Sequence, residues 1–190
     1  MLNYASYHRL PNPSIGNRIL IRGLNEQDRE ELRAFFQQAP AEDAQFCKQD
    51  IKDPKVGDYL LNPDNSLRIL SLVAVDMATN QIVANLIVYK GQHAGQHVGE
   101  IQQILVSRPL QGLGLGSLIL DKLIDLAKEE NLHWLKVEVV VEMKNVIKAL
   151  QSRGFQIKAI FDDYYIDAQR RTYDVALMMR SLLRKDDEDF

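Results

Sequence analysis

The feature that most limits how this chain can fold is a glycine-rich turn, Gln111-Gly112-Leu113-Gly114-Leu115-Gly116. It follows a β-rich segment over residues 100–106 and precedes a segment with the apolar spacing of an amphipathic helix, which ends near Asn131. Glycine permits positive φ and lets a ligand approach the backbone closely. The start of a helix adds unpaired N–H groups and the positive end of a dipole. The turn therefore predicts an anion site, suited to phosphate or pyrophosphate.

Other glycine-rich phosphate sites fit this turn less well. A Walker loop ends in Gly-Lys-Ser/Thr, whereas Gly116 is followed by Ser117 and Leu118. A dinucleotide-binding turn would require glycine at position 117 and a preceding parallel-strand unit, and the strands expected before this turn are antiparallel. The hypothesis that the chain is a nucleotide-binding regulator is supported by the glycine turn alone. The remaining alternative is a tight turn that binds no ligand.

The order of the expected elements predicts an α/β fold with a mixed, largely antiparallel sheet flanked by helices. Helices are expected after an N-cap at Asn25, after the glycine turn, and over residues 144–153, where Gly154 would be the C-cap. Residues 41–65 are interrupted by proline and glycine and predict short helices and loops. Strands are expected over residues 18–22, 67–75, 81–89, 100–106, 133–141, 155–161 and 172–180.

A single domain is expected over residues 18–183, because a chain of 190 residues suits one core. Residues 1–17 predict an irregular N-terminal arm, and residues 184–190 predict an acidic, solvated tail. The net charge of −3 gives no overall attraction to nucleic acid, and no apolar run approaches the ~20 residues of a membrane helix. There is no signal-peptide pattern, and Cys47 is the only cysteine, so a cytoplasmic protein with an inert thiol is expected.

The glycine turn and its surroundings resemble the GNAT superfamily of N-acetyltransferases. The pyrophosphate loop of that family has the pattern Arg/Gln-x-x-Gly-x-Gly/Ala, which Gln111, Gly114 and Gly116 match. The resemblance covers roughly residues 18–181 and is closest to small bacterial members. Its other parts are the strand end Ile104 to Pro109, the helix after the turn, the strand 135–141, the pair Gly154-Phe155, the stretch His97 to Ile101 and the late pair Tyr173-Asp174.

The resemblance implies direct transfer of an acetyl or short acyl group from CoA to a primary amine in a ternary complex, without a metal. In this family the strand that corresponds to Ile104–Val106 carries a β-bulge and splays from its neighbour. The segment from Glu100 to Ile104 breaks strict alternation, which fits a bulge or an exposed polar pair at a sheet edge. The residues implied in CoA binding are Ile104, Leu105, Val106, Gln111, Gly112, Leu113, Gly114, Leu115, Gly116 and Ser117.

The candidate general base is Glu100, which precedes Gln111 by the offset at which family members carry a catalytic glutamate. A surface glutamate on a strand is the alternative. The general acid of many members is a tyrosine four residues before the Gly-Phe glycine, where this chain has Leu150, which cannot donate a proton. The remaining acid candidates are Tyr164, Tyr173 and, beside them, Tyr165; otherwise the thiolate leaves without assistance.

The resemblance implies a small-molecule or peptide amine as acceptor, and a homodimer, because members of the family often dimerise. Three acids, Asp162, Asp163 and Asp167, are expected in one late loop, where they either attract a cationic amine or keep the loop solvated. His93 and His97 have a glycine between them, which favours a loop near the acceptor over a metal-binding helix. The alternative function is a non-catalytic CoA-binding or protein-interaction module, which thioester turnover would distinguish.

Overall fold

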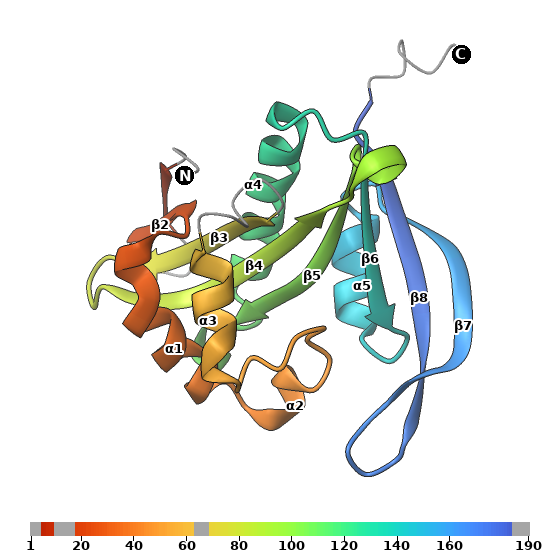
Figure 1. Ribbon diagram of the computed structural model, residues 1–190, viewed down its shortest axis with the longest axis horizontal. Helices are drawn as coiled ribbons and strands as arrows, with labels where there is room; N and C mark the ends of the chain where they lie inside the picture. Colours follow the sequence, from red (N-terminus) through yellow and green to blue (C-terminus); the bar gives the residue numbers. More distant parts are fainter. Residues whose placement is uncertain (1–4, 10–17, 63–68, 184–190) are drawn as a thin grey trace. The chain divides into compact units, whose positions relative to one another are not determined.

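The computed structural model describes residues 5–9, 18–62 and 69–183 (Figure 1). Its strands are β1 (Ala5–Arg9), β2 (Arg18–Gly23), β3 (Ile69–Asp76), β4 (Gln81–Lys90), β5 (Val98–Val106), β6 (Trp134–Val140), β7 (Gln156–Ile166) and β8 (Thr172–Ser181). Its α-helices are α1 (Arg29–Gln38), α2 (Ala41–Ala44), α3 (Pro54–Leu61), α4 (Leu115–Glu129) and α5 (Lys144–Gln151). In the described part of the chain, no helix combines the length and apolarity needed to cross a membrane.

The chain divides into two compact units. The first comprises the described residues of Met1–Tyr89 and Gln102–Leu123, and the second those of Lys90–Ile101 and Ile124–Phe190. The strand β5 and the helix α4 each contribute residues to both units. The single domain expected over residues 18–183 stays a prediction, and the acidic tail at 184–190 lies outside the described residues.

In the first unit the strands follow the order β1-β2-β3-β4-β5. The pairs β1–β2, β2–β3 and β3–β4 are antiparallel. A tight hairpin joins β3 and β4: the N–H of Asn80 donates to the carbonyl of Asp76 at 2.7 Å, and Asn80 has φ 56°. The apolar side chains of β3 and β4 are almost all buried, which places the core of this unit on its central strands.

The irregular arm expected over residues 1–17 is wrong in one part, because Ala5–Arg9 forms strand β1. Its backbone pairs with β2 throughout, with Tyr7 opposite Leu20. A strand at the edge of a sheet is held by hydrogen bonds to its neighbour, so its sequence need not show the apolar alternation of a buried strand. Residues 1–4 and 10–17 lie outside the described part.

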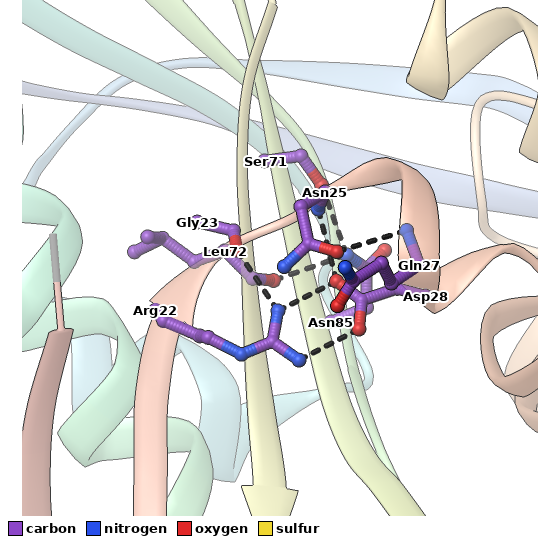
Figure 2. A network of polar contacts seen from close by, with 8 residues as sticks. All are labelled: Arg22, Gly23, Asn25, Gln27, Asp28, Ser71, Leu72 and Asn85. Atoms are coloured by element: carbon purple, nitrogen blue, oxygen red, sulfur yellow. Dashed lines mark hydrogen bonds and ion pairs between the residues drawn. The ribbon is translucent and has the colours of Figure 1, made fainter. Parts of the chain in front are cut away.

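The N-cap expected at Asn25 is confirmed (Figure 2). The Asn25 side chain accepts the N–H of Gln27 at 3.0 Å, and Asp28 in turn accepts the N–H of Asn25 at 2.9 Å. Arg22 on β2 donates two hydrogen bonds of 2.6 Å to the buried carboxylate of Asp28. The start of the first helical segment is thereby fixed to β2 by a paired charge rather than by propensity alone.

A network of buried polar side chains joins β3, β4 and β5 in the first unit. The Asn85 amide donates to the Ser71 hydroxyl at 3.1 Å and to the carbonyl of Leu72 at 3.0 Å (Figure 2). The Gln103 amide donates to the side-chain oxygen of Asn85 at 2.9 Å. Asn85 is fully buried and Gln103 is 7% exposed, so these bonds are made away from water.

In the second unit the strands follow the order β5-β6-β8-β7. The pair β5–β6 is parallel, and β6–β8 and β7–β8 are antiparallel. The predicted mixed α/β fold with a largely antiparallel sheet is confirmed. The C-cap expected at Gly154 is also confirmed: Gly154 has φ 80°, and the N–H of Phe155 reaches the carbonyl of Leu150 at 3.2 Å.

The late strand β7 is longer than expected. It runs past Phe161 to Ile166, and Asp162 and Asp163 therefore lie in a strand rather than in a loop with Asp167. The pairing of β7 with β8 is irregular between Phe161 and Tyr165 and then resumes. The two acids fall in this irregularity, which is why their sequence resembles a loop.

The buried pair Asn85–Gln103 leads to a stability prediction. Replacing either residue alone, as Asn85→Leu or Gln103→Leu, leaves a buried polar atom of the other unpaired and should cost about 1–3 kcal/mol of unfolding free energy. The double replacement removes both partners and should cost less than the sum of the two, as expected for residues in contact. Urea unfolding of the four proteins measures the coupling, and strictly additive losses would show that the pair is not coupled.

Candidate active site

The glycine turn lies in the first unit, between the end of β5 and the start of α4. Gly112 has φ +74° and Gly114 has φ +90°, a backbone region that disfavours residues with a side chain. A Cβ atom built at either glycine would meet nothing within 4 Å. The two glycines therefore allow the backbone to adopt this conformation, and the space beside them is open to a ligand.

The start of α4 presents unpaired donors next to this open backbone. The N–H of Leu118 donates to the carbonyl of Gly114 at 3.0 Å. The three preceding N–H groups, of Leu115, Gly116 and Ser117, have no acceptor among the described residues, as is normal for the first turn of a helix. Leu115 is fully buried and anchors the turn to the core. These features fit a pyrophosphate held by backbone N–H groups and the helix dipole.

Gln111 ties the turn to two other parts of the first unit. Its amide donates to the carbonyl of Val106, the last residue of β5, at 3.0 Å and to the carboxylate of Asp43 at 3.1 Å. Arg108 forms ion pairs with Glu42 and Asp43 of α2. Gln111 therefore positions the turn through side-chain contacts of its own. The two acids on α2 were not expected at this site, because the sequence gives no sign that residues 41–44 lie beside the turn.

The burial of β5 alternates without interruption from Val98 to Val106. The break expected at Glu100–Ile104 is therefore not seen in the burial pattern, because Gln103 points into the core and bonds to Asn85. Because Gln103 is buried, the alternative of an exposed polar pair at a sheet edge is wrong for this residue. Ile104 and Val106 share the less buried face, and Leu105 packs in the core. β5 pairs with β6 from Val98, opposite Trp134, to Ile101, opposite Val137.

Glu100 lies on the half-buried face of β5 in the second unit, directly opposite Lys136 of β6. The Lys136 ammonium is 2.7 Å from a Glu100 carboxylate oxygen, and the two side chains are 35% and 23% exposed. This contact shows that the Glu100 carboxylate can accept a hydrogen bond from a primary ammonium while remaining accessible to solvent.

The three tyrosines considered as acids have different surroundings. Tyr173 donates its hydroxyl to Asp167 at 3.0 Å, in a loop where the Asp167 side chain is 1% exposed and also binds Arg171. Tyr164 is 52% exposed, with its ring centroid 5.2 Å from that of Phe161. The contact with Asp167 favours a structural role for the Tyr173 hydroxyl in closing the β7–β8 loop.

Tyr165 is the tyrosine that reaches β6. Its hydroxyl donates to the Glu138 carboxylate at 2.9 Å. Burial raises the pKa of Tyr165 well above its ordinary value, and the hydrogen bond to Glu138 raises the pKa further. A tyrosine in this state retains its proton and is a weaker acid than usual, so Tyr165 is better placed to orient Glu138 than to protonate a leaving thiolate. Leu150 is 1% exposed and belongs to the core of α5.

Cys47 is partly buried against the core of the first unit. Burial raises the pKa of its thiol from an ordinary 9.0 to about 11, and the charge of Asp43 adds to this effect. The neutral thiol is therefore favoured in the folded protein at neutral pH, which is unfavourable for an acyl carrier.

The raised pKa of Cys47 predicts slow thiol chemistry. At pH 8 the folded protein should react with a thiol-specific disulfide reagent about 100-fold more slowly than the urea-unfolded chain, because the thiolate fraction falls tenfold per pKa unit. The rate should rise with pH until about 11. Rapid labelling of the folded protein at pH 7 would instead identify Cys47 as a reactive thiol.

The two histidines of the connection before β5 are separated. His97 packs its ring against His133, with centroids 5.5 Å apart, whereas His93 lies in a short 3-10 turn with φ 51°. Within residues 5–9, 18–62 and 69–183, no group of three or more metal-ligating side chains is assembled.

Several solved structures share this fold. An acetyltransferase of the GNAT family from Streptococcus pneumoniae has 22% identity and a TM-score of 0.72, over 86% of this chain and 99% of that one. The ribosomal-protein-S5-alanine acetyltransferase from Vibrio fischeri has 16% identity and a TM-score of 0.78, over 94% and 97%. The ribosomal-protein-S18-alanine N-acetyltransferase from Escherichia coli has 20% identity and a TM-score of 0.70, over 90% and 99%.

A search among curated proteins found no match. A family model does match: the model described as the acetyltransferase (GNAT) family covers residues 28–155, which include the glycine turn, Glu100 and the helix α5. This match extends over more than half of the sequence, and the chain therefore belongs to the acetyltransferase (GNAT) family.

Proposed function

We propose that this member of the acetyltransferase family transfers an acetyl or short acyl group from CoA to a primary amine, directly and within a ternary complex. The observation that carries the proposal is the glycine turn at the start of α4, where two residues with positive φ leave the backbone open beside unpaired N–H groups. These donors are suited to a pyrophosphate, the group that CoA would present there.

The first unit would hold the acyl donor. The backbone N–H groups of Leu115, Gly116 and Ser117 would bind the pyrophosphate, and Gly112, Leu113 and Gly114 would shape the approach to it. Along β5, Ile104, Leu105 and Val106 would pair their backbone groups with the extended arm of the donor. Gln111 would keep the turn against the end of β5 through its bond to the Val106 carbonyl. The thioester supplies the activated acyl group.

The second unit would handle the amine. An acceptor arrives as an ammonium ion and must lose a proton before its nitrogen can attack. Glu100 would accept this proton, and the acceptor's ammonium would replace that of Lys136 at the carboxylate. Tyr165 would hold Glu138 in place on the neighbouring part of the same face. Of the two acid candidates, Tyr164 has no hydrogen-bond partner for its hydroxyl among the described residues, whereas the Tyr173 hydroxyl is bonded to Asp167 and is the less favoured of the two.

The acceptor class stays at the level of a primary amine, on a small molecule or a peptide. Proteins of similar structure are named as acetyltransferases of acceptors as different as ribosomal-protein alanine, phosphinothricin and spermidine. All of these structures are under 25% identical to this chain, so they share its fold and do not select an acceptor. The alternative is a non-catalytic module of the same fold, consistent with Leu150 at the position of a proton donor. Release of CoA thiol from acetyl-CoA across a panel of amines distinguishes the two.

Acetyl-CoA binding should raise the thermal stability of the protein. A ligand specific for the folded state at ~100 times its Kd adds ~2.7 kcal/mol, which for a chain of this size corresponds to roughly 5–10 °C in Tm. ATP and NAD should give much smaller shifts. Equal shifts for all three ligands, or none with CoA, would contradict the assignment of the turn.

Ser117→Glu tests whether the pyrophosphate lies at the start of α4, and Ser117→Gln is its matched control. A carboxylate in the first turn of a helix favours the fold, so the melting temperature without ligand should not fall. The same negative charge opposes a bound pyrophosphate, so the Glu variant should lose most of its CoA-induced shift while the Gln variant keeps more of it. Equal CoA affinity of the two variants would place the phosphates elsewhere.

Glu100→Gln should lower the rate by about 10²–10⁴, as expected for loss of a positioned base. The deficit should be largest at low pH, where the acceptor is protonated, and should shrink at high pH, where the free amine is abundant. CoA affinity should not change. A pH–rate profile of parent and variant with one accepted amine measures this.

Lys136→Gln is the matched control, because it breaks the same ion pair from the other side. If Glu100 acts as the base, Lys136→Gln should retain most of the rate at low pH. If the two variants lose activity equally at every pH, the ion pair is structural and the proton goes to another group, such as Asp163, or to water.

A further inference from the structure

Two carboxylates of α2 lie beside the glycine turn, where a negatively charged ligand is proposed to bind. Asp43 accepts a hydrogen bond of 3.1 Å from the Gln111 amide, whose nitrogen also donates to the Val106 carbonyl at 3.0 Å. Glu42 is the neighbour of Asp43 in the chain. A carboxylate repels a phosphate, so these two acids would oppose the binding of CoA unless their charge were compensated.

The position of Asp43 has a structural explanation. The Gln111 amide links the end of β5 to α2, and an ionised carboxylate is a stronger acceptor for it than a neutral group. The charge of Asp43 also acts on its neighbours. Burial is the main cause of the raised pKa of the Cys47 thiol, and the charge of Asp43 adds to it. The same charge therefore fixes the turn and acts against an anion bound there.

Arg108 supplies the opposite charge from the segment that leads into the turn. It begins the 3-10 helix η5 (Arg108–Leu110), and the N–H of Gln111 donates to its carbonyl at 3.1 Å. Its guanidinium forms ion pairs with Glu42 and, at 3.5 Å, with Asp43. A hydrogen bond to its own backbone and the contact with Arg108 lower the pKa of Glu42, so this acid is ionised at neutral pH. Over residues 5–9, 18–62 and 69–183, Arg108 is the only cation paired with either acid.

We propose that Arg108 is a positioning residue for the acyl donor: it neutralises Glu42 and Asp43, so that a pyrophosphate can bind at the start of α4, and it does not contact the phosphates itself. The inference rests on the proposed function, because it concerns the affinity for CoA. Physiological salt screens charges beyond ~8 Å, so the effect requires carboxylates close to the turn. The contact between Asp43 and Gln111 provides this proximity.

The test is the Kd of CoA for the full chain, measured by calorimetry at low salt. Arg108→Gln leaves two uncompensated carboxylates beside the turn and should weaken CoA binding about tenfold. The triple variant Arg108→Gln/Glu42→Gln/Asp43→Asn removes the repulsion and should recover most of the affinity. Asparagine at position 43 keeps a side-chain oxygen that can accept the Gln111 amide, so the turn stays in place.

Two further variants separate the local charge from other effects of the replacement. Arg108→Lys keeps a cation beside the acids and should retain most of the affinity. Arg29→Gln removes a cation from an ion pair with Asp58, which joins α1 to α3 and contains no residue of the turn. This matched control should bind CoA as the parent does. The Arg108 side chain is 51% exposed, so its replacement should leave the fold intact.

Salt distinguishes a role of charge from a role of shape. In about 1 M salt the Debye length falls to about 3 Å, so the ratio of the two Kd values, Arg108→Gln over parent, should approach one. A ratio that stays near its low-salt value would overturn the inference, because Arg108 would then hold the turn in shape.

The remaining outcomes separate this inference from the proposed function. Equal affinity of the parent and Arg108→Gln at low salt, or an equal loss in Arg29→Gln, would overturn the inference alone. A loss that the triple variant does not recover would overturn it too, because the guanidinium would then bind a phosphate directly. A parent that does not bind CoA would overturn the proposed function together with the inference.

Discussion

The hydrogen bond between Asn85 and Gln103 determines which face of β5 is inside, and much of the first unit follows from that choice. Side chains alternate along a strand, so burial of Gln103 also buries Leu105 and turns Ile104 and Val106 to the opposite face. A slip by one residue would place the Gln103 amide in water and leave the buried Asn85 oxygen without a donor. The register of β5 is thus maintained by the free-energy cost of leaving a buried polar group unpaired, as well as by the burial of apolar side chains.

The end of β5 then sets the place of the glycine turn. The Val106 carbonyl is held by Gln111, and the two acids of α2 hold Gln111 and Arg108 in turn. The backbone path through Gly112 and Gly114 leads directly to the free N–H groups of α4. The anion site that we propose there would depend on backbone geometry rather than on a basic side chain, which is compatible with the net negative charge of the chain.

In the second unit the candidate residues are charged side chains on two neighbouring strands, rather than backbone groups. Glu100, Lys136 and Glu138 occupy half-buried positions on β5 and β6, and Tyr165 joins them through Glu138. Each of these charged groups therefore has a partner within the unit. The raised pKa of Tyr165 is part of the same balance, because a buried phenol beside a carboxylate keeps its proton.

Local sequence signals by themselves located the strands β2 to β8 along the chain, the cap at Asn25, the C-cap at Gly154 and the glycine turn, because each depends on neighbouring residues and on backbone preferences. The family resemblance, which the matching family model bears out, rests on the same local patterns. The tertiary structure alone decided that Gln103 is buried, that Ala5–Arg9 is a strand, that β7 reaches Ile166 and that α2 touches the turn. These depend on partners distant in the chain, as Asp43 is from Gln111, and a hydrogen bond or an ion pair across such a separation leaves no periodic trace in the sequence.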